Sequence, residues 1–256
     1  MNIFDFYVIN LDKDIDRLNI IEQRLYPNKF IRISGIYGNT TNFENNKDIF
    51  ITSRYLVPKS VLGCWLSHKK AINTFLTNST KEYAVILEDD AIPINNNYIN
   101  EINEAINNAP NDWDVIKLDF TPKYNNNFNK YFSLLATSYI INKKSAKKLL
   151  DNKIYYYPDF DMNFYNLNVY NNTKIVFKQD WSNDNSSNNK IFMGYNPIML
   201  FNNYFSFKCI RLINIEFSFA DIFLFLILII IIFINYNFIY NIINRNILYI
   251  IKLSKS

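Results

Sequence analysis

Glycine is scarce in this chain: four glycines occur in 256 residues. Neither a G-x-G-x-x-G segment nor a G-K-[ST] segment is present. The usual sequence evidence for a dinucleotide site or a P-loop phosphate site is therefore missing. The shortage also means that some turns must be built from other residues, among which Asn tolerates a positive φ angle.

Cysteine is rarer still, and a strong excess of charge is absent. The two cysteines, Cys64 and Cys209, form neither a disulfide framework nor a zinc-ligand spacing, so we expect two reduced structural thiols. The net charge of +4 is small and scattered, and no basic stripe is interleaved with aromatic residues, so we expect no nucleic acid partner. Apolar residues make up 49% of the chain, which is typical of folded proteins.

Strand-like and helix-like segments alternate along the chain. Short apolar runs predict strands, and apolar residues at helical spacing predict helices. The expected strands are Phe4–Leu11, Phe30–Ile33, Tyr83–Leu87, 113–120 and 132–142, and the expected helices are 12–26, 60–78, 96–110 and 143–151. This alternation favours an α/β fold with a largely parallel or mixed sheet. Polar stretches at Asn39–Tyr55 and Trp181–Lys190 predict loops.

The C-terminal part differs in composition from the rest. Ile222–Ile234 is an unbroken apolar run of 13 residues, preceded by Asp221. About fifteen strongly apolar side chains in this region favour membrane insertion by about 5 to 9 kcal/mol, whereas a central Asp would cost about 3 kcal/mol. We therefore expect a catalytic domain over 1–205 and a membrane anchor over 206–256 with a single transmembrane helix; the alternative is a buried helix of a soluble domain. The opening segment lacks the regions of a signal peptide, so the catalytic domain is expected in the cytoplasm.

Three consecutive acids, Glu88, Asp89 and Asp90, directly follow the apolar run Tyr83–Leu87. Ligands of α/β sheets bind outside the carboxyl ends of strands, and crowded carboxylates are costly there unless a cation joins them. A divalent hard metal held by one or two carboxylates and by substrate phosphates would meet that need. The alternative is a solvated acidic turn at the end of a strand.

Four segments that occur in order along the chain carry a family resemblance. They are an opening V-I-N-L strand with a following D-R pair, a G-C-x-x-S-H motif, an apolar strand ending in E-D-D, and a later strand and helix with A-x-x-L. The residues are Val8, Ile9, Asn10, Leu11, Asp16, Arg17, Gly63, Cys64, Ser67, His68, Glu88, Asp89, Asp90, Ala146 and Leu149. Over roughly Phe4–Gln179 the chain resembles glycosyltransferase family 25, the family of bacterial lipooligosaccharide galactosyltransferases and procollagen galactosyltransferase domains.

The resemblance implies a GT-A-like fold, a UDP-sugar donor and Mn²⁺ or Mg²⁺. Glycosyl transfer requires that the charge of the departing diphosphate be neutralised, and a carboxylate-held metal does this as a Lewis acid. Glu88, Asp89 and Asp90 are the expected metal-side acids. Because successive strand residues alternate faces, one of the three should point away from the metal.

Five further side chains are expected around the donor. Asn10 at the end of the first strand is a candidate for a uridine contact, and Arg17 for the donor site, with a surface ion pair to Asp14 or Asp16 as the alternative. His68, the only histidine, is expected to contact the donor phosphate or the acceptor; a purely structural role is equally open. Ser67 and Gln179 complete the set, although Ser67 has the alternative of a helix-internal hydroxyl.

Acids later in the chain are candidates for the acceptor side. The resemblance favours inversion at the anomeric carbon, which requires a general base, and Asp159 or Asp161 in the segment YPDFD fits that role. Asp119 lies where it could also reach the site.

The sequence thus predicts a metal-dependent glycosyltransferase that moves a sugar, expected to be galactose, from a UDP-sugar to a glycan, a lipid-linked glycan or a protein hydroxyl. One alternative is a non-catalytic, membrane-anchored relative that binds a nucleotide sugar or a partner. Another is a metal-dependent phosphohydrolase, which is disfavoured because a single histidine is present.

Overall fold

A computed structural model describes most of the chain. The described residues are 3–119, 127–130, 133, 135–180, 208–212, 215–230 and 232–233. Two compact units are formed, 1–190 and 191–256, and each is treated by itself. The expected domain boundary after residue 205 and the expected loop Trp181–Lys190 lie outside the described residues and stay predictions.

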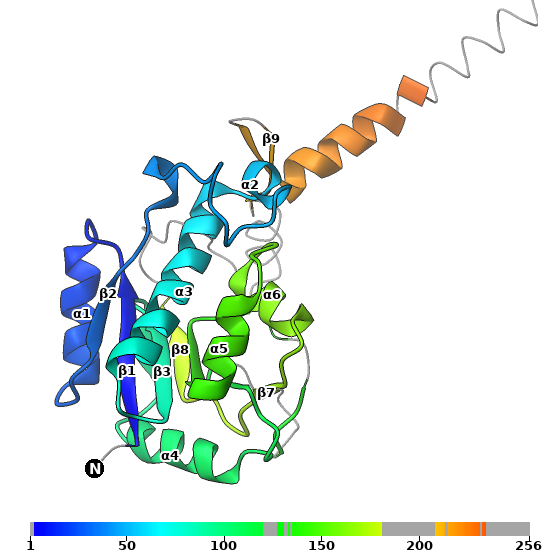
Figure 1. Ribbon diagram of the computed structural model, residues 1–256. Helices are drawn as coiled ribbons and strands as arrows, with labels where there is room; N and C mark the ends of the chain where they lie inside the picture. Colours follow the sequence, from blue (N-terminus) through cyan, green and yellow to red (C-terminus); the bar gives the residue numbers. More distant parts are fainter. Residues whose placement is uncertain are drawn as a thin grey trace, which may run out of the picture. The chain divides into compact units, whose positions relative to one another are not determined.

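A six-stranded mixed sheet forms the centre of the first unit (Figure 1). In spatial order its strands are β2 (Ile31–Ser34), β1 (Phe4–Asn10), β3 (Tyr83–Glu88), β6 (Ser138–Asn142), β5 (Val115–Lys117) and β7 (Val169–Asn171). Strands β2, β1 and β3 are parallel, β6 runs antiparallel to both of its neighbours, and β7 is parallel to β5. The expected α/β fold with a mixed sheet is confirmed.

Helices cover both faces of this sheet. Successive side chains of a strand point to opposite faces, and the apolar side chains on each face pack against helices. In β3, Ala84 and Ile86 belong to one apolar core and Val85 and Leu87 to the other. The first core takes side chains from α3 (Lys59–Asn78), α5 (Lys143–Asp151) and α6 (Pro158–Phe164), and the second from α1 (Ile15–Leu25) and α4 (Tyr98–Asn108). Helix α3 lies in front of the strands in Figure 1.

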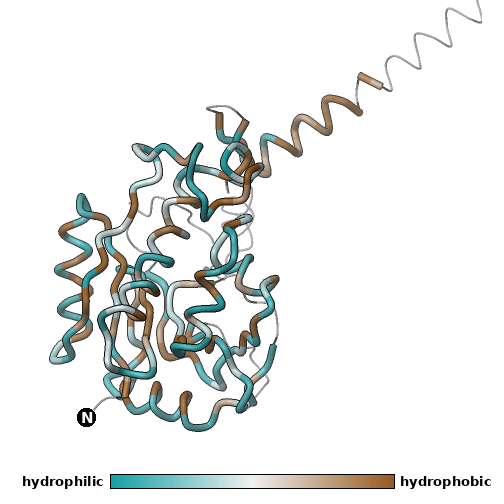
Figure 2. Tube along the Cα trace, viewed as in Figure 1, coloured by the Kyte–Doolittle hydropathy of each residue, from teal (hydrophilic) through white to brown (hydrophobic). Residues whose placement is uncertain are grey.

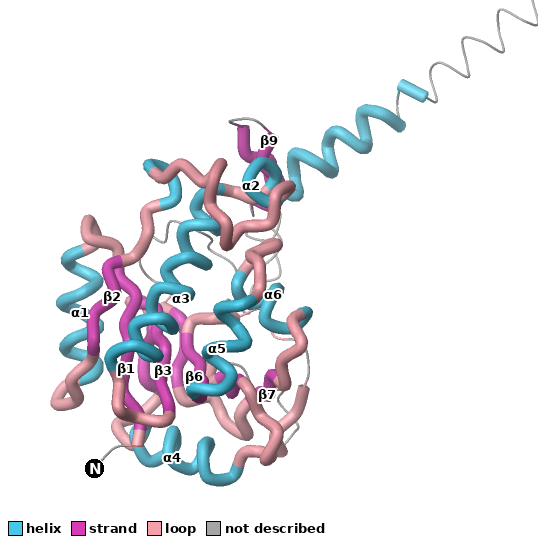
Figure 3. Tube along the Cα trace, in the orientation of Figure 1, coloured by secondary structure: helices cyan, strands magenta, loops and turns pink. Residues whose placement is uncertain are grey.

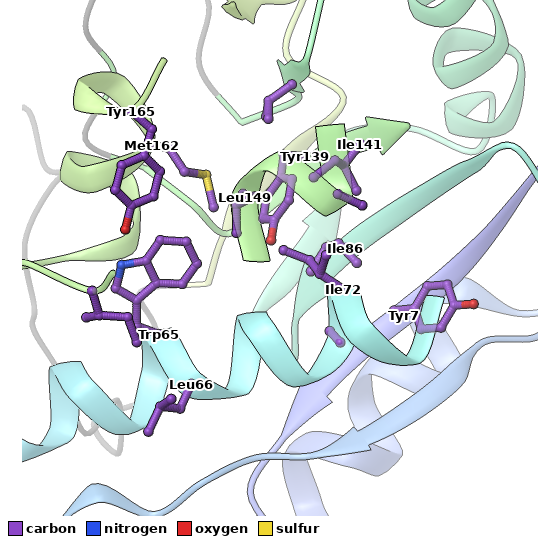
Figure 4. Packing of buried hydrophobic residues seen from close by; sticks show 14 of the residues in the cluster. Tyr7, Trp65, Leu66, Ile72, Ile86, Tyr139, Ile141, Leu149, Met162 and Tyr165 are labelled. Carbon is purple, nitrogen blue, oxygen red and sulfur yellow. The ribbon is translucent and has the colours of Figure 1, made fainter. Parts of the chain in front are cut away.

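Trp65 is the largest fully buried side chain and anchors α3 in the first core. Its indole stacks on the ring of Tyr165 at a centroid distance of 6.1 Å, and Figure 4 shows it beside Tyr165 and Met162, which both come from the α6 region. Removing a buried Trp from such a core costs about 3 to 5 kcal/mol. The chain around α6 is thus fixed against α3.

Several elements differ from the sequence-based expectation. Within the described residues the expected strands 113–120 and 132–142 correspond to the shorter β5 and β6, and the last Cα pair of β6 with β3 joins Ser138 to Leu87; residues 120, 132 and 134 lie outside the described residues. The expected loop Asn39–Tyr55 contains part of a 3₁₀ turn, Gly38–Thr40, and the start of a short helix, α2 (Ser53–Leu56; Figure 3). In the first unit helix α6, strand β7 and a small antiparallel pair of β4 (Ala91–Pro93) with β8 (Phe177–Gln179) were also not expected.

The second unit contains an antiparallel pair, β9 (Lys208–Leu212) and β10 (Ile215–Ser218), followed by a helix over 219–230. Asp221 Oδ2 accepts from the backbone N–H of Ser218 at 2.7 Å at the start of this helix. Figure 2 shows how strongly apolar this helix is. In the described part of the chain, no helix is long and apolar enough to cross a membrane, so the expected transmembrane anchor is not supported. The end of its apolar run, Ile234, lies outside the described residues.

Replacing Gly63 by Ala should destabilise the first unit, because Gly63 lets α3 pass close to a neighbouring loop. A Cβ atom there would lie 2.5 Å from the Ile36 carbonyl oxygen and 2.8 Å from the Gly38 nitrogen. Both are backbone atoms, so we expect a loss of about 2 kcal/mol in the free energy of unfolding, despite a helix-propensity gain of about 1 kcal/mol. Urea denaturation measures this loss. Gly35→Ala is the matched control, since its Cβ would first meet the end of the Leu11 side chain at 3.1 Å; equal losses in both variants would contradict the close approach.

Candidate functional site

The candidate site lies at the sheet edge where β1, β3 and β5 end and β6 begins. These three strands run in the same direction, and β6 runs against β3 and β5. Asn10, Glu88 and Lys117 are the last residues of β1, β3 and β5. Such an edge is where α/β sheets bind their ligands.

The three acids at the end of β3 are divided between the two faces of the sheet. Glu88 points toward α3, where its Oε1 lies 3.1 Å from His68 Nε2 and 3.7 Å from Cys64 Sγ. Asp89 and Asp90 are both nearly buried and make contact with α1 through Arg17. The triplet is therefore not a single cluster of carboxylates: Glu88 has partners of its own.

Arg17 joins the other two acids. Its Nη2 atom pairs with Asp89 Oδ1 and lies 3.2 Å from Asp90 Oδ2. Asn10 Nδ2 donates to Asp89 Oδ2 at 2.7 Å, and Gln179 Nε2 donates to Asp90 Oδ2 at 3.0 Å. Five of the residues singled out from the sequence are thus brought together, although they come from β1, α1, β8 and the turn after β3. Arg17 thus pairs with Asp89 and Asp90, and not with Asp14 or Asp16, the surface pair that was the alternative.

Of the two acids that contact Arg17, Asp90 is the one that retains an oxygen without a partner. Its Oδ1 is buried and has no hydrogen-bond partner among the described residues, and the same holds for Asp119 Oδ1. An oxygen of this kind is a suitable ligand for a hard cation, which binds through one or two carboxylates and completes its shell with phosphate and water oxygens. Both oxygens of Asp89 are already engaged, so a cation at this point would rely on Asp90 among the protein carboxylates.

His68 is fully buried beneath Glu88. Its Nδ1 lies 3.1 Å from the Tyr139 hydroxyl, and its ring stacks on the Tyr139 ring at 5.7 Å. Ser67, next to it in the chain, donates to the Gly63 carbonyl and accepts from the Ile36 N–H, both at 2.7 Å. Neither of these Ser67 contacts involves the acids, so the structure places Ser67 where it ties α3 to the loop at Ile36.

The two acids of α6 have different surroundings. Asp161 is buried, and its carboxylate accepts from Trp65 Nε1 at 2.8 Å and from the backbone N–H groups of Tyr155 and Tyr156 at 2.8 and 3.0 Å. Asp159 accepts from the backbone N–H of Phe160 at 3.0 Å. Asp161 thus holds the start of α6 in place, whereas the Asp159 carboxylate accepts fewer hydrogen bonds.

Lys117 is the site residue that the sequence did not single out. It is fully buried at the end of β5, and its Nζ donates to the Leu135 carbonyl and lies 5.9 Å from the centre of the Tyr139 ring. Asp119, two residues later, accepts from the Ser138 N–H at 3.0 Å. The signal was present: Lys117 follows Val115 by two residues in β5, so the two side chains share the face of the sheet that packs in the first core.

Burial raises the pKa of several of these carboxyls. It brings the pKa of Asp90 and Asp159 to about 7 and that of Asp89 and Asp119 to about 6, with the negative charge of Glu88 adding to the effect. Arg17 works against this rise in pKa at Asp89 and Asp90.

The pKa values of Glu88 and Lys117 are lowered instead. Burial alone would raise the pKa of Glu88, but the hydrogen bond from His68 and the charge of Arg17 hold it below its ordinary value. Burial lowers the pKa of Lys117. The site is therefore rich in carboxyls and short of positive charge, which is the electrostatic setting in which a cation is favoured.

The comparison with known families decides which class of enzyme this site belongs to. The family model for glycosyltransferase family 25, described as an LPS biosynthesis protein, matches residues 4–163. The chain belongs to glycosyltransferase family 25. This match covers Asn10, Arg17, the three acids, His68 and both acids of α6. As a family 25 glycosyltransferase, the protein acts on a sugar donor and an acceptor.

Other comparisons add little. No curated protein matches this family 25 chain. One solved structure, the crystal structure of A197 from STIV, is similar at 11% sequence identity and a TM-score of 0.33, over 75% of this chain and 99% of that one. A likeness of this strength carries no inference about fold or function.

Replacing Asp90 by Asn should stabilise the protein above neutral pH. Since the folded pKa of Asp90 is raised to about 7 from an unfolded value of about 4, the folded chain holds this proton more tightly, and stability is lost as pH rises through 7. The amide introduced by the substitution stays neutral at every pH and avoids this loss. We expect Asp90→Asn to gain about 1–2 kcal/mol over the wild type near pH 8 and almost nothing near pH 4.

Urea denaturation in the presence of a chelator measures this difference. Asp112→Asn is the control, because Asp112 is exposed and its pKa is lowered by a hydrogen bond from Tyr170. A gain that is the same at both pH values, or equal in the two variants, would contradict a raised pKa at Asp90.

Proposed function

We propose that this family 25 protein transfers a hexose, with galactose as the expected sugar, from a UDP-sugar to a hydroxyl of a glycan, a lipid-linked glycan or a protein. The observation that carries the proposal is the convergence of Asn10, Arg17, Asp89, Asp90 and Gln179 at one sheet edge, with a buried Asp90 oxygen left available. A GT-A-like arrangement of the sheet agrees with this position of the donor.

The donor would lie over the ends of β1 and β3. Asn10 is our candidate for the uridine contact, and Arg17 supplies the protein cation nearest to the diphosphate. Asp90 Oδ1 would hold Mn²⁺ or Mg²⁺, with Asp89 held in place by Arg17 and Asn10. A bound divalent ion would neutralise charge on the departing UDP as a Lewis acid. Gln179, by donating to Asp90 Oδ2, would keep the other oxygen of that carboxylate turned toward the ion.

On the acceptor side, we assign the general base to Asp159. A base works best when its pKa lies near the working pH, and burial brings the pKa of Asp159 to about 7. The Asp159 carboxylate would take the proton of the acceptor hydroxyl. At the same time the acceptor oxygen would form its bond to the anomeric carbon, and the bond from that carbon to UDP would break. Asp161 would position α6, and His68 would position Glu88 rather than touch substrate.

The non-catalytic alternative also has an observation in its favour. Each of the three acids has a hydrogen-bond or ion-pair partner within the chain, namely Arg17, Asn10, Gln179 or His68, so the site is held together by protein groups alone. A relative that binds a nucleotide sugar without transferring it would need no more than this. Donor binding without turnover would select this alternative.

Donor binding is expected to require both a divalent metal and Asp90. Isothermal calorimetry of UDP-galactose and UDP-glucose with the full chain, with and without Mn²⁺, measures this. In Asp90→Asn we expect the affinity with Mn²⁺ to fall more than about tenfold, or about 1.4 kcal/mol. Glu104→Gln is the control, because Glu104 is exposed on α4 and pairs with Lys174. Equal binding in the wild type and Asp90→Asn would remove the proposed donor site.

Asp159→Asn and Asp161→Asn should fail in different ways. For Asp159→Asn we expect UDP release from UDP-galactose, with a panel of saccharide acceptors, to fall by about 10²- to 10⁴-fold while donor affinity is kept and the chain stays folded. For Asp161→Asn we expect the free energy of unfolding to fall by about 1–3 kcal/mol, because one buried carboxylate serves several N–H donors. Full turnover in a folded Asp159→Asn variant would exclude Asp159 as the base.

A further inference from the structure

Cys64, His68 and Glu88 form a cluster that the proposed transfer reaction does not use as a unit. Cys64 and His68 are four residues apart on α3 and therefore lie on the same face of the helix, which turns toward the end of β3. His68 Nε2 is 3.1 Å and Cys64 Sγ is 3.7 Å from Glu88 Oε1. The three ligand atoms all lie within 4.8 Å of one another.

These distances are close to the ligand shell of a tetrahedral metal: the Cys64–Glu88 separation of 3.7 Å fits it, and the His68–Glu88 separation of 3.1 Å would have to lengthen slightly. Zinc binds sulfur at about 2.3 Å and nitrogen or oxygen at about 2.0–2.2 Å, which puts neighbouring ligand atoms about 3.3–3.8 Å apart. Thiolate and imidazole select zinc-like ions over Mg²⁺ or Mn²⁺. We propose that Cys64, His68 and Glu88 form a binding site for Zn²⁺ or a similar borderline cation, separate from the hard-cation position at Asp90.

The surroundings of the cluster support this assignment. A metal-ligating histidine usually uses its second ring nitrogen to hold an outer partner, and His68 Nδ1 lies 3.1 Å from the hydroxyl of the fully buried Tyr139. His68 is inaccessible, but a quarter of the Glu88 side chain is exposed. Three protein ligands with one open side are the arrangement of zinc sites that leave a fourth position for water or substrate oxygen.

Metal binding has a defined proton balance. The Sγ–H bond of Cys64 breaks, a bond from Sγ to the metal forms, and the thiol proton leaves to solvent. His68 must present an unprotonated Nε2, so its ring proton is carried by Nδ1 and donated to the Tyr139 oxygen. No change of oxidation state occurs.

The site does not depend on glycosyl transfer, and it revises the expectation that Cys64 is only a structural thiol. The two metal positions are distinguishable because Glu88 belongs to the zinc-type site and Asp90 does not. The test therefore includes Asp90→Asn, which should leave the zinc-type site intact.

The experiment is a titration of the metal-stripped full chain with Co²⁺, followed by displacement with Zn²⁺. The expected result is one Co²⁺ per chain with a thiolate-to-cobalt charge-transfer band and the intense d–d bands of a four-coordinate ion. The charge-transfer band should vanish in Cys64→Ser and persist in Cys209→Ser and Asp90→Asn. Cys209, in β9, is the matched control because it is the other cysteine of the chain.

Tyr139→Phe tests the outer partner without removing a ligand. Zinc affinity, measured by competition with a chromophoric chelator, should fall about 10- to 100-fold. The proposal is overturned if the wild type shows no thiolate band, if the band survives in Cys64→Ser, or if it is lost in Cys209→Ser. Circular dichroism of each variant ensures that loss of the band is not loss of fold.

Discussion

The contact of the Arg17 guanidinium with Asp89 and Asp90 is the interaction on which the site depends. Two nearly buried carboxyls next to a third acid would be strongly unfavourable without it. Even with it, burial keeps the pKa of both Asp side chains above their ordinary value. The protein therefore has a deficit of positive charge at one sheet edge, and such a setting would favour a cation.

The framework of the fold was predictable from the sequence because periodicity encodes which side of an element is buried. Helix α3 was anticipated over 60–78 and forms over Lys59–Asn78. Helix α6 was not anticipated: its seven residues are too few for a periodic pattern, and its position depends on Trp65 and Asp161, which are 96 residues apart. The ends of the strands could also not be predicted from the sequence, because they depend on where pairing with a neighbouring strand stops.

The candidate site was predictable in its members more than in its contacts. Asn10, Arg17 and Gln179 contact Asp89 or Asp90, and their role at a donor site stays a prediction. What spacing could not tell is that β6 runs against its neighbours, which brings Tyr139 between His68 and Lys117. The direction of a strand depends on the tertiary structure, and here it determines which buried polar side chains lie next to one another.

The short pairing of β4 with β8 has a consequence for the order in which parts of the protein fold during synthesis. It joins Ala91 to Gln179 and carries the hydrogen bond from the Asp180 N–H to the Asp90 carbonyl. A chain that has left the ribosome only as far as α5 already contains Arg17 and the acids from Glu88 to Asp90, but it lacks Gln179, whose amide donates to Asp90. Contacts of such long sequence separation form late because the entropy of loop closure is lost before they can stabilise anything. Most of the sheet can thus assemble while the donor side is still incomplete.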